Sequence, residues 1–191
     1  MADQKVLVIC GSLRKGSYNA ALARALPALA PEGMKLIMAP PIGTFPLYNA
    51  DIQEASGFPP DAEDLATAIR GADAVLFVTP EYNWSMPGVL KNAIDWVARV
   101  RERGDPAYAA FKGRVFAIAS ASPEAGGGLH SLMALRQILE LGCGALVIPE
   151  QVSIPNADDA FDEMDNIIDS HAAHLFRAQL ARLVELARLM N

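Results

Sequence analysis

The chain has 191 residues, 52% of them hydrophobic and 20% charged, and a formal net charge of −6. This length and composition indicate one globular domain over residues 1–191 with a sizeable core. The negative charge disfavours nucleic acid as a partner, and no apolar run approaches the ~18 residues that a membrane span needs.

The cysteines and the start of the chain predict a cytoplasmic protein. Cys10 lies in an apolar run and Cys143 lies between two glycines, so they form neither a metal spacing nor a disulfide framework. The first residues contain an early acid and a short strand-like run, which is not the pattern of a secretory signal. We expect no metal ion and no membrane partner.

Residues 5–19 predict an anion site. Val6 to Cys10 is a short run rich in β-branched residues, typical of a strand buried on both faces of a parallel sheet. Small and polar residues follow from Gly11, and a helical pattern begins at Ala20. The first amides of a helix lack partners and carry the positive end of its dipole, so a strand, a short loop and a helix start together can hold a phosphate.

The side chains of this loop suit one terminal phosphate. Ser12, Ser17 and Asn19 add neutral donors. Arg14 adds a cation that can grip a phosphate through two nitrogens. The loop is not a P-loop, because Lys15 precedes the second glycine, and the dinucleotide fingerprint G-x-G-x-x-G is absent. An ordinary strand-to-helix turn capped by Ser17 is the alternative that this loop leaves open.

Farther along the chain, strands and helices alternate. Helices are predicted over residues 18–30, 61–70, 89–100 and 129–141 and from about 161 to 189, strands over 35–38, 74–78, 115–119 and 145–148, and a long proline-rich loop over 39–60. Five apolar strands alternating with five helices predict an α/β fold, a doubly wound parallel sheet with helices on both faces. The leading candidate is the flavodoxin-like strand order 2-1-3-4-5.

Three loops with unusual chemistry follow the first, third and fourth strands. The second of them, residues 80–88, is aromatic and has two prolines, and the third, residues 120–128, consists mostly of small residues. Ligands of such sheets bind at the carboxyl ends of the strands, at the switch point between strands one and three. We therefore expect the three loops to meet at one site.

These loops resemble the signature segments of the NAD(P)H-dependent FMN reductase family, which includes bacterial quinone, chromate and azo-dye reductases. The likeness is carried by GSLRKGSYN, PEYNWSMPGVLKNAIDW and SASPEAGGGLHSLMALR and spans roughly residues 4–155. It implies FMN as cofactor, NADH or NADPH as co-substrate, and a ping-pong oxidoreductase. The implied acceptors are quinones and similar small molecules, including chromate, azo dyes, ferric complexes or free flavin. The family usually forms homodimers or homotetramers.

The resemblance also implies which residues bind the cofactor. The expected set is Ser12, Arg14, Ser17 and Asn19 at the phosphate, Pro80, Glu81, Tyr82, Asn83 and Ser85 around the isoalloxazine, and Ser120, Ser122, Gly126 and Gly127 beside the flavin's edge. Tyr82 and Trp84 form the expected substrate slot, although Trp84 and Met86 are as readily explained as packing. Glycines allow a flat ring to approach the backbone closely, or alternatively mark a flexible surface turn. No catalytic side chain is expected, because flavin itself carries hydride chemistry.

A second class of function remains open at this point. A flavodoxin-type electron carrier, or a redox-sensing FMN-binding protein without turnover, would use the same loops. A carrier would expose its flavin within a strongly acidic surface, whereas the moderate charge and the bulky Tyr82 and Trp84 favour an enzyme. The spacer over residues 101–112 has no assigned role. For the acidic run over 158–165 we expect carboxylates at a helix N-terminus rather than a metal site.

Overall fold

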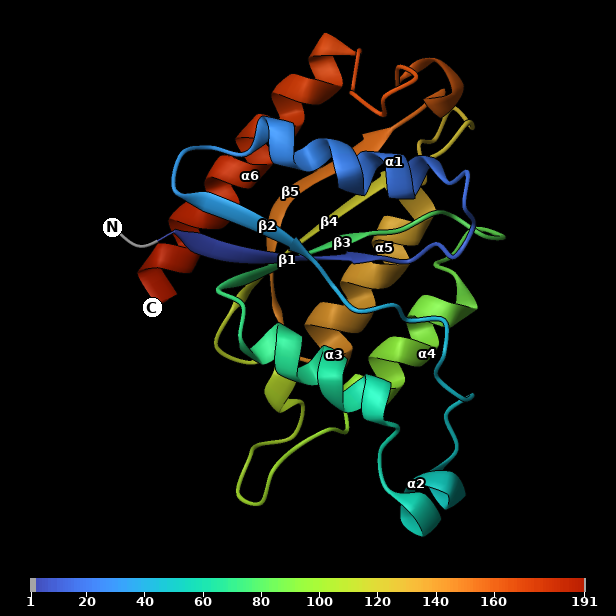
Figure 1. Cartoon of the computed structure of the whole chain (residues 1–191), viewed down its shortest axis with the longest axis vertical. Coiled ribbons are helices and arrows are strands. Elements are labelled where there is room, and N and C mark those ends of the chain that lie inside the picture. Colours follow the sequence, from blue (N-terminus) through green and yellow to red (C-terminus); the bar gives the residue numbers. More distant parts are fainter. Residues whose placement is uncertain (1–2, 191) are drawn as a thin grey trace.

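A computed structural model describes residues 3–190 as a five-stranded parallel sheet between two layers of helices (Figure 1). The strand order is β2-β1-β3-β4-β5, and each neighbouring pair is parallel, as the sequence predicts. The strands are β1 (Gln4–Cys10), β2 (Met34–Met38), β3 (Ala74–Val78), β4 (Val115–Ala121) and β5 (Leu146–Ile154). The helices are α1 (Tyr18–Ala25), α2 (Ala50–Ser56), α3 (Pro60–Arg70), α4 (Gly88–Val97), α5 (Leu129–Gln137) and α6 (Ser170–Met190).

The two faces of the sheet bury different residues of the same strands. In β1, Val6 and Val8 pack with α1 and α6. The alternate residues Leu7 and Ile9 face α3, α4 and α5 on the opposite side (Figure 1). Successive side chains of a strand point to opposite faces, so a continuous apolar run is required where both faces are covered. The helices on both faces therefore follow from the run Val6 to Cys10 and its counterparts.

The first predicted helix changes character at Pro27. Regular α1 ends at Ala25, and Leu26–Leu29 continues as a 3-10 turn with Pro27 near its start. Proline has no N–H for an intrahelical bond and crowds the preceding turn, which explains the early end.

The predicted long loop between β2 and α3 contains a short helix, α2. Asn49 caps it by accepting a hydrogen bond from the Asp51 N–H at 2.9 Å. None of its residues is buried. Because α2 has no apolar stripe, periodicity gave no sign of it.

The last helix begins at Ser170, so the prediction of a start near residue 161 is wrong. Asp169 caps α6 by accepting from the N–H groups of His171, at 2.8 Å, and Ala172, at 3.2 Å. Before it, Phe161 and Ile167 form an isolated bridge that closes a loop. The hydrophobic spacing of α6 is as predicted, but the cap that defines its first turn lies eight residues later.

The acidic run consequently does not lie at the N-terminus of α6, whereas Asp158 and Asp159 belong to a short 3-10 turn, Ala157–Asp159. Asp158 accepts a hydrogen bond from the Tyr18 hydroxyl, and Asp165 pairs with Arg24 at 2.7 Å. Asp162 accepts from the N–H of Asn166 at 2.8 Å and thereby closes a turn. Asp158 and Asp165 thereby attach the loop before α6 to α1. Within residues 3–190, no group of three or more His, Cys, Asp or Glu side chains is placed to hold a metal ion.

Strand β5 extends farther than the apolar run at 145–148. Its register against β4 shifts between Phe116 and Ile118, after which Ile118 pairs with Gln151 and Ala121 with Ile154. The second half is less uniformly buried, which explains why it lacks the apolar signal of the first. In the part of the chain described, no helix is long and apolar enough to cross a membrane.

Candidate functional site

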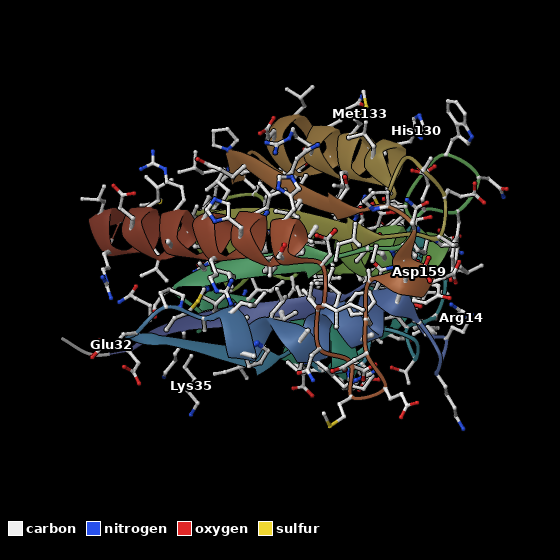
Figure 2. All side chains as sticks on the ribbon, turned by 90° about the horizontal axis from the view of Figure 1, so that it is seen from above. Arg14, Glu32, Lys35, His130, Met133 and Asp159 are labelled. Carbon is white, nitrogen blue, oxygen red and sulfur yellow. The ribbon has the colours of Figure 1, made fainter. Side chains whose placement is uncertain are left out.

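The loops after β1, β3 and β4 meet at the carboxyl edge of the sheet. Figure 2 shows Arg14, Asp159 and His130 at this end of the molecule. The loops enclose a cavity of about 220 Å³. Its lining residues are Ser12, Arg14, Ser17, Tyr18, Asn19, Pro80, Glu81, Tyr82, Ala121, Ser122 and Pro123. The expected convergence of the three loops is thus present, whereas Asn83, Ser85, Ser120, Gly126 and Gly127 lie outside the cavity lining.

The first loop combines a helix cap with an open anion site. Ser17 caps α1, since its hydroxyl oxygen accepts from the N–H groups of Asn19, at 3.2 Å, and Ala20, at 3.4 Å. No acceptor within residues 3–190 takes a hydrogen bond from the backbone N–H groups of residues 15–18. The two sequence interpretations are therefore compatible, because a capped turn still presents these amides at the positive end of the helix.

Arg14 supplies the cation of this loop. It is exposed, and its guanidinium lies 5.7 Å from the centre of the Tyr18 ring. Among the side chains described, no carboxylate forms an ion pair with it. The Ser12 hydroxyl oxygen accepts from the Arg14 N–H at 3.3 Å, which leaves the Ser12 proton for another acceptor. The loop therefore offers positive charge and donors to an anion.

Asn19 joins the first loop to the third. Its amide Nδ2 donates to the Ala121 carbonyl at 2.8 Å, and the Ala121 N–H donates to Oδ1 at 2.9 Å. The side chain is buried at the end of β4. One Nδ2 hydrogen remains, but the main effect of Asn19 in the structure is to fix the position of the α1 start against β4.

Tyr18 lies between the two motif residues Ser17 and Asn19 and also lines the cavity. Its hydroxyl donates to Asp158, and this hydrogen bond raises the pKa of the phenol. The sequence analysis missed Tyr18 although it stands inside the motif GSLRKGSYN. An aromatic residue next to a cap is also common as plain packing, so the sequence carries little signal for it.

The second loop forms a tight hairpin beside the cavity. The Tyr82 N–H donates to the Ser85 carbonyl at 2.8 Å, and the Ser85 N–H donates to the Tyr82 carbonyl at 3.1 Å. Between them Asn83 and Trp84 both have positive φ, 49° and 64°. Two consecutive residues in the left-handed region are typical of a type I′ turn, which suits Asn but not Trp. Tyr82 is 49% exposed and Trp84 is 74% exposed, whereas Met86 is buried and packs in the core.

Glu81 of the same loop binds the start of α5. Its Oε2 accepts from the His130 N–H at 2.9 Å and the Ser131 N–H at 3.3 Å, and its Oε1 lies 3.0 Å from His130 Nδ1. A carboxylate is favoured at a helix N-terminus because it satisfies free amides and the dipole. His130, which the sequence analysis left without a role, is thereby attached to the candidate site.

The glycines of the third loop pack against the protein itself. A Cβ on Gly127, at φ +61°, would lie 2.9 Å from the Pro155 nitrogen. A Cβ on Gly128, at φ +87°, would lie 2.8 Å from the Ser120 hydroxyl. Only Gly126 of the three has open space around its Cβ position. The space beside these two glycines is thus filled by the protein itself, by the end of β5 at Gly127 and by Ser120 of β4 at Gly128.

Comparison with known proteins identifies the family. The profile of the NADPH-dependent FMN reductase family matches residues 4–159. An NAD(P)H-dependent FMN reductase of Pseudomonas aeruginosa is 46% identical over 95% of this chain and 94% of its own length. A quinone reductase of Escherichia coli is 46% identical over 71% of this chain and 69% of its own.

A solved structure gives the same result. The flavoenzyme FerB of Paracoccus denitrificans, an NAD(P)H:(acceptor) oxidoreductase, superposes with a TM-score of 0.80 at 30% identity and covers 98% of both chains. The chain belongs to the NADPH-dependent FMN reductase family. It is an oxidoreductase with FMN as cofactor and NADH or NADPH as co-substrate, which confirms the family and cofactor predictions.

Proposed function

We propose that the protein passes two electrons from NADH or NADPH, through FMN, to quinones and related small acceptors in a ping-pong cycle. The observation that carries this proposal is the cavity where the three loops meet. The amides of residues 15–18 and the Arg14 guanidinium there have no acceptor or carboxylate partner among residues 3–190, and Tyr82 lines the same cavity. Bound FMN supplies the hydride chemistry. The task of the protein is to hold it, orient it and admit flat partners.

The residues of the first loop fit the phosphate of such a cofactor. Charge-assisted hydrogen bonds from Arg14, neutral donation from Ser12 and the amides of residues 15–18 match a dianion at a helix start. We propose that Ser17 and Asn19 act mainly by shaping this loop, since both side chains already make protein contacts.

The second and third loops would hold the isoalloxazine. Pro80, Glu81 and Tyr82 line the cavity from β3, and Ser122 lines it from β4. Asn83, Ser85, Ser120, Gly126 and Gly127 remain proposed ring contacts, although the cavity wall does not include them.

Turnover distinguishes this proposal from an electron carrier. The relatives named as quinone reductases reduce quinones, and we propose the same acceptor class here, with chromate, azo dyes, ferric complexes and free flavin as further candidates. The two aromatic rings of Tyr82 and Trp84 beside the cavity support flat acceptors, which stack well on such side chains.

We further propose a homodimer or homotetramer in the cytoplasm, without nucleic-acid or membrane partners. Support for self-association comes from large apolar side chains that remain exposed on and near α5, namely Leu129, Met133, Leu141 and Leu146. Of these, Leu141 also lines a groove of about 450 Å³ between α4 and the end of α5. A second copy of the chain would cover this surface.

One experiment tests the function directly. The purified holoenzyme is mixed with NADH or NADPH and a water-soluble quinone, and nicotinamide oxidation is followed at steady state. We expect many turnovers per flavin, and chromatography of the released flavin should show FMN rather than FAD. A protein that is reduced once by NAD(P)H but does not turn over with any quinone would be a carrier, and the enzyme proposal would be wrong.

A further inference from the structure

Trp84 has an unusual conformation for so large a residue. Its φ of 64° follows a φ of 49° at Asn83, and its side chain is 74% exposed. Bulky residues avoid the left-handed region, and such conformations persist only where surrounding contacts determine them. The exposed indole must therefore be held by specific neighbours.

His130 is that neighbour. Its imidazole is stacked on the Trp84 indole with ring centres 3.9 Å apart and planes 22° from parallel. A stack of this kind covers one face of the indole, and the exposure of Trp84 shows that the other face is open to solvent. The pair forms an aromatic surface with a vacant outer face.

Glu81 fixes the imidazole in turn. Its carboxylate holds His130 at Nδ1 and at the backbone N–H, at 3.0 and 2.9 Å, and it is well shielded, with 17% of its side chain exposed. His130 is the second residue of α5, so its backbone is as rigid as the helix that packs on β4. The contacts thus run from a helix start through Glu81 and His130 to Trp84.

This arrangement lies next to the proposed flavin site. Glu81 and Tyr82 line the cavity, and Trp84 is the second residue of the two-residue turn that follows them. Figure 2 shows His130 at the end of the molecule where Arg14 lies. A flat molecule that enters beside Tyr82 would meet the open face of Trp84.

We propose that His130 is a positioning residue that holds Trp84 as a fixed wall of the acceptor site and thereby favours flat, multi-ring acceptors over small inorganic ones. The inference rests on the proposed quinone reductase function and adds a determinant of acceptor choice. His130 touches neither acceptor nor cofactor in this role. It acts by orienting the indole. Because the Trp84 side chain is then ordered before the acceptor binds, less conformational entropy is lost on binding.

The orientation of Trp84 can be measured without any turnover. The chain has two tryptophans, and Trp96 is fully buried, so quenching of tryptophan emission by acrylamide reports Trp84. In the holoenzyme, His130→Ala exposes the second face of the Trp84 indole. This variant should raise the acrylamide quenching constant roughly twofold and speed the local motion of the indole in anisotropy decay. His130→Phe retains a stacking ring and should restore most of the wild-type behaviour. His174→Ala, which removes an exposed histidine on α6, is the matched control.

Acceptor choice is then measured on the same variants. For a two-ring naphthoquinone, His130→Ala should raise KM roughly two- to tenfold while kcat changes less than about twofold. For ferricyanide, which has no flat ring, both constants should stay at wild-type values, as should FMN content. His130→Phe should bring the naphthoquinone KM back toward wild type, and His174→Ala should change nothing.

The measurements separate a wrong function from a wrong role for His130. A wild-type protein that reduces no acceptor overturns the proposed function, while the quenching data still report whether His130 holds Trp84. A wild type that turns over, with His130→Ala affecting ferricyanide and naphthoquinone equally or neither of them, overturns the positioning role alone. Wild-type Trp84 that acrylamide hardly reaches would mean a covered indole, as beneath a second copy of the chain, and would likewise overturn it.

Discussion

Arg14 in the first loop and Asn19 at the start of α1 lie five residues apart, and the fold gives them opposite environments. Arg14 is exposed at the cavity with no carboxylate partner among residues 3–190, whereas Asn19 is buried and bonded to both backbone groups of Ala121. The motif identifies both positions but not this difference. Whether a polar side chain contacts a ligand or the chain itself depends on β4, a strand about a hundred residues later.

Arg14→Ala should therefore weaken FMN binding with little effect on folding. A charge-assisted contact to a phosphate is worth roughly 1.5–3 kcal/mol, or about ten- to a hundredfold in affinity. Titration of the flavin-free protein with FMN measures the affinity, and urea unfolding of the same protein measures stability. Lys15→Ala removes the same charge from the adjacent exposed position and is the control. Wild-type affinity in Arg14→Ala would contradict the assignment of this loop to the phosphate.

Asn19→Ala, unlike Arg14→Ala, should cause a large loss of folding stability. It leaves a buried N–H and a buried carbonyl of Ala121 without their side-chain partner, and each such loss costs about 1–3 kcal/mol. We expect a total decrease of roughly 2–4 kcal/mol in the free energy of unfolding by urea. Asn49→Ala removes the exposed cap of α2 and should cost only about 1 kcal/mol. Equal effects of the two substitutions would show that Asn19 is not a tie between loops.

Cys143 should react slowly with alkylating reagents. Burial raises the pKa of its thiol from 9.0 to about 11, so near pH 8 about one thiol in a thousand is ionised. In Cys10→Ser, where Cys143 is the remaining cysteine, the rate with iodoacetamide should rise about tenfold per pH unit between pH 7 and 9.5. In the urea-unfolded protein, whose thiol has the ordinary pKa of 9.0, the rise should instead begin to level off near pH 9. Since the folded pKa is the higher one, this group's stabilising contribution is present below about pH 9 and is lost as pH rises toward 11.

At the scale of elements, α6 contributes one polar side chain to the irregular pairing of β4 and β5. Gln179 is fully buried, and its Nε2 donates to the carbonyls of Ile118, at 2.9 Å, and Glu150, at 3.0 Å. These carbonyls flank the point where the register shifts. A regular ladder would satisfy them within the sheet, so the amide replaces a bond that the irregularity removes.

Gln179→Leu should destabilise the fold by about 1–3 kcal/mol, because two buried carbonyls lose their donor. The Gln179 Oε1 has no partner among the described residues, which holds the expected loss at the lower end of that range. Urea unfolding measures it, and Arg177→Ala, an exposed substitution on the same helix, should stay within about 0.5 kcal/mol of wild type. An unchanged or raised stability of Gln179→Leu would mean that the amide is dispensable.

The helices and strands also show what the sequence could and could not predict. Runs such as Val6 to Cys10 indicate strands covered on both faces, and their number and alternation with helices made the observed sheet order the leading candidate. The pattern missed α2, which buries nothing, and misplaced the start of α6, which depends on the cap at Asp169. It marked the glycines of the third loop, but positive φ and the contact with β5 at Gly127 become visible only in three dimensions. The contacts of Glu81 with His130 join loops 49 residues apart and leave no local signal.

At the scale of the whole molecule, the expected self-association can be tested by measuring the molecular mass in solution. Light scattering coupled to size-exclusion chromatography should give a mass that is two or four times that of the 20.4 kDa chain. Leu141→Arg places a charge on the exposed apolar surface near α5 and should shift the mass toward the monomer, while Glu32→Arg, an exposed change next to β2, should not. A monomeric wild type would exclude the homo-oligomer.

The order of substrate binding is also a property of the whole assembly of loops. Residues of the loops after β1, β3 and β4, Tyr82 among them, line one cavity, and we propose that nicotinamide and acceptor reach the flavin there from the same side. Two flat molecules that stack on one face cannot be bound together, and each must leave before the other enters. Double-reciprocal plots against NAD(P)H at several fixed quinone concentrations should therefore be parallel, and high quinone should slow turnover by competing with NAD(P)H. The control is product inhibition: NAD(P)⁺ should compete with quinone and not with NAD(P)H, because in a shared-face cycle product and acceptor bind the same enzyme form. Intersecting lines would require a ternary complex and two separate sites, and would contradict the proposal that both substrates use one face of the flavin.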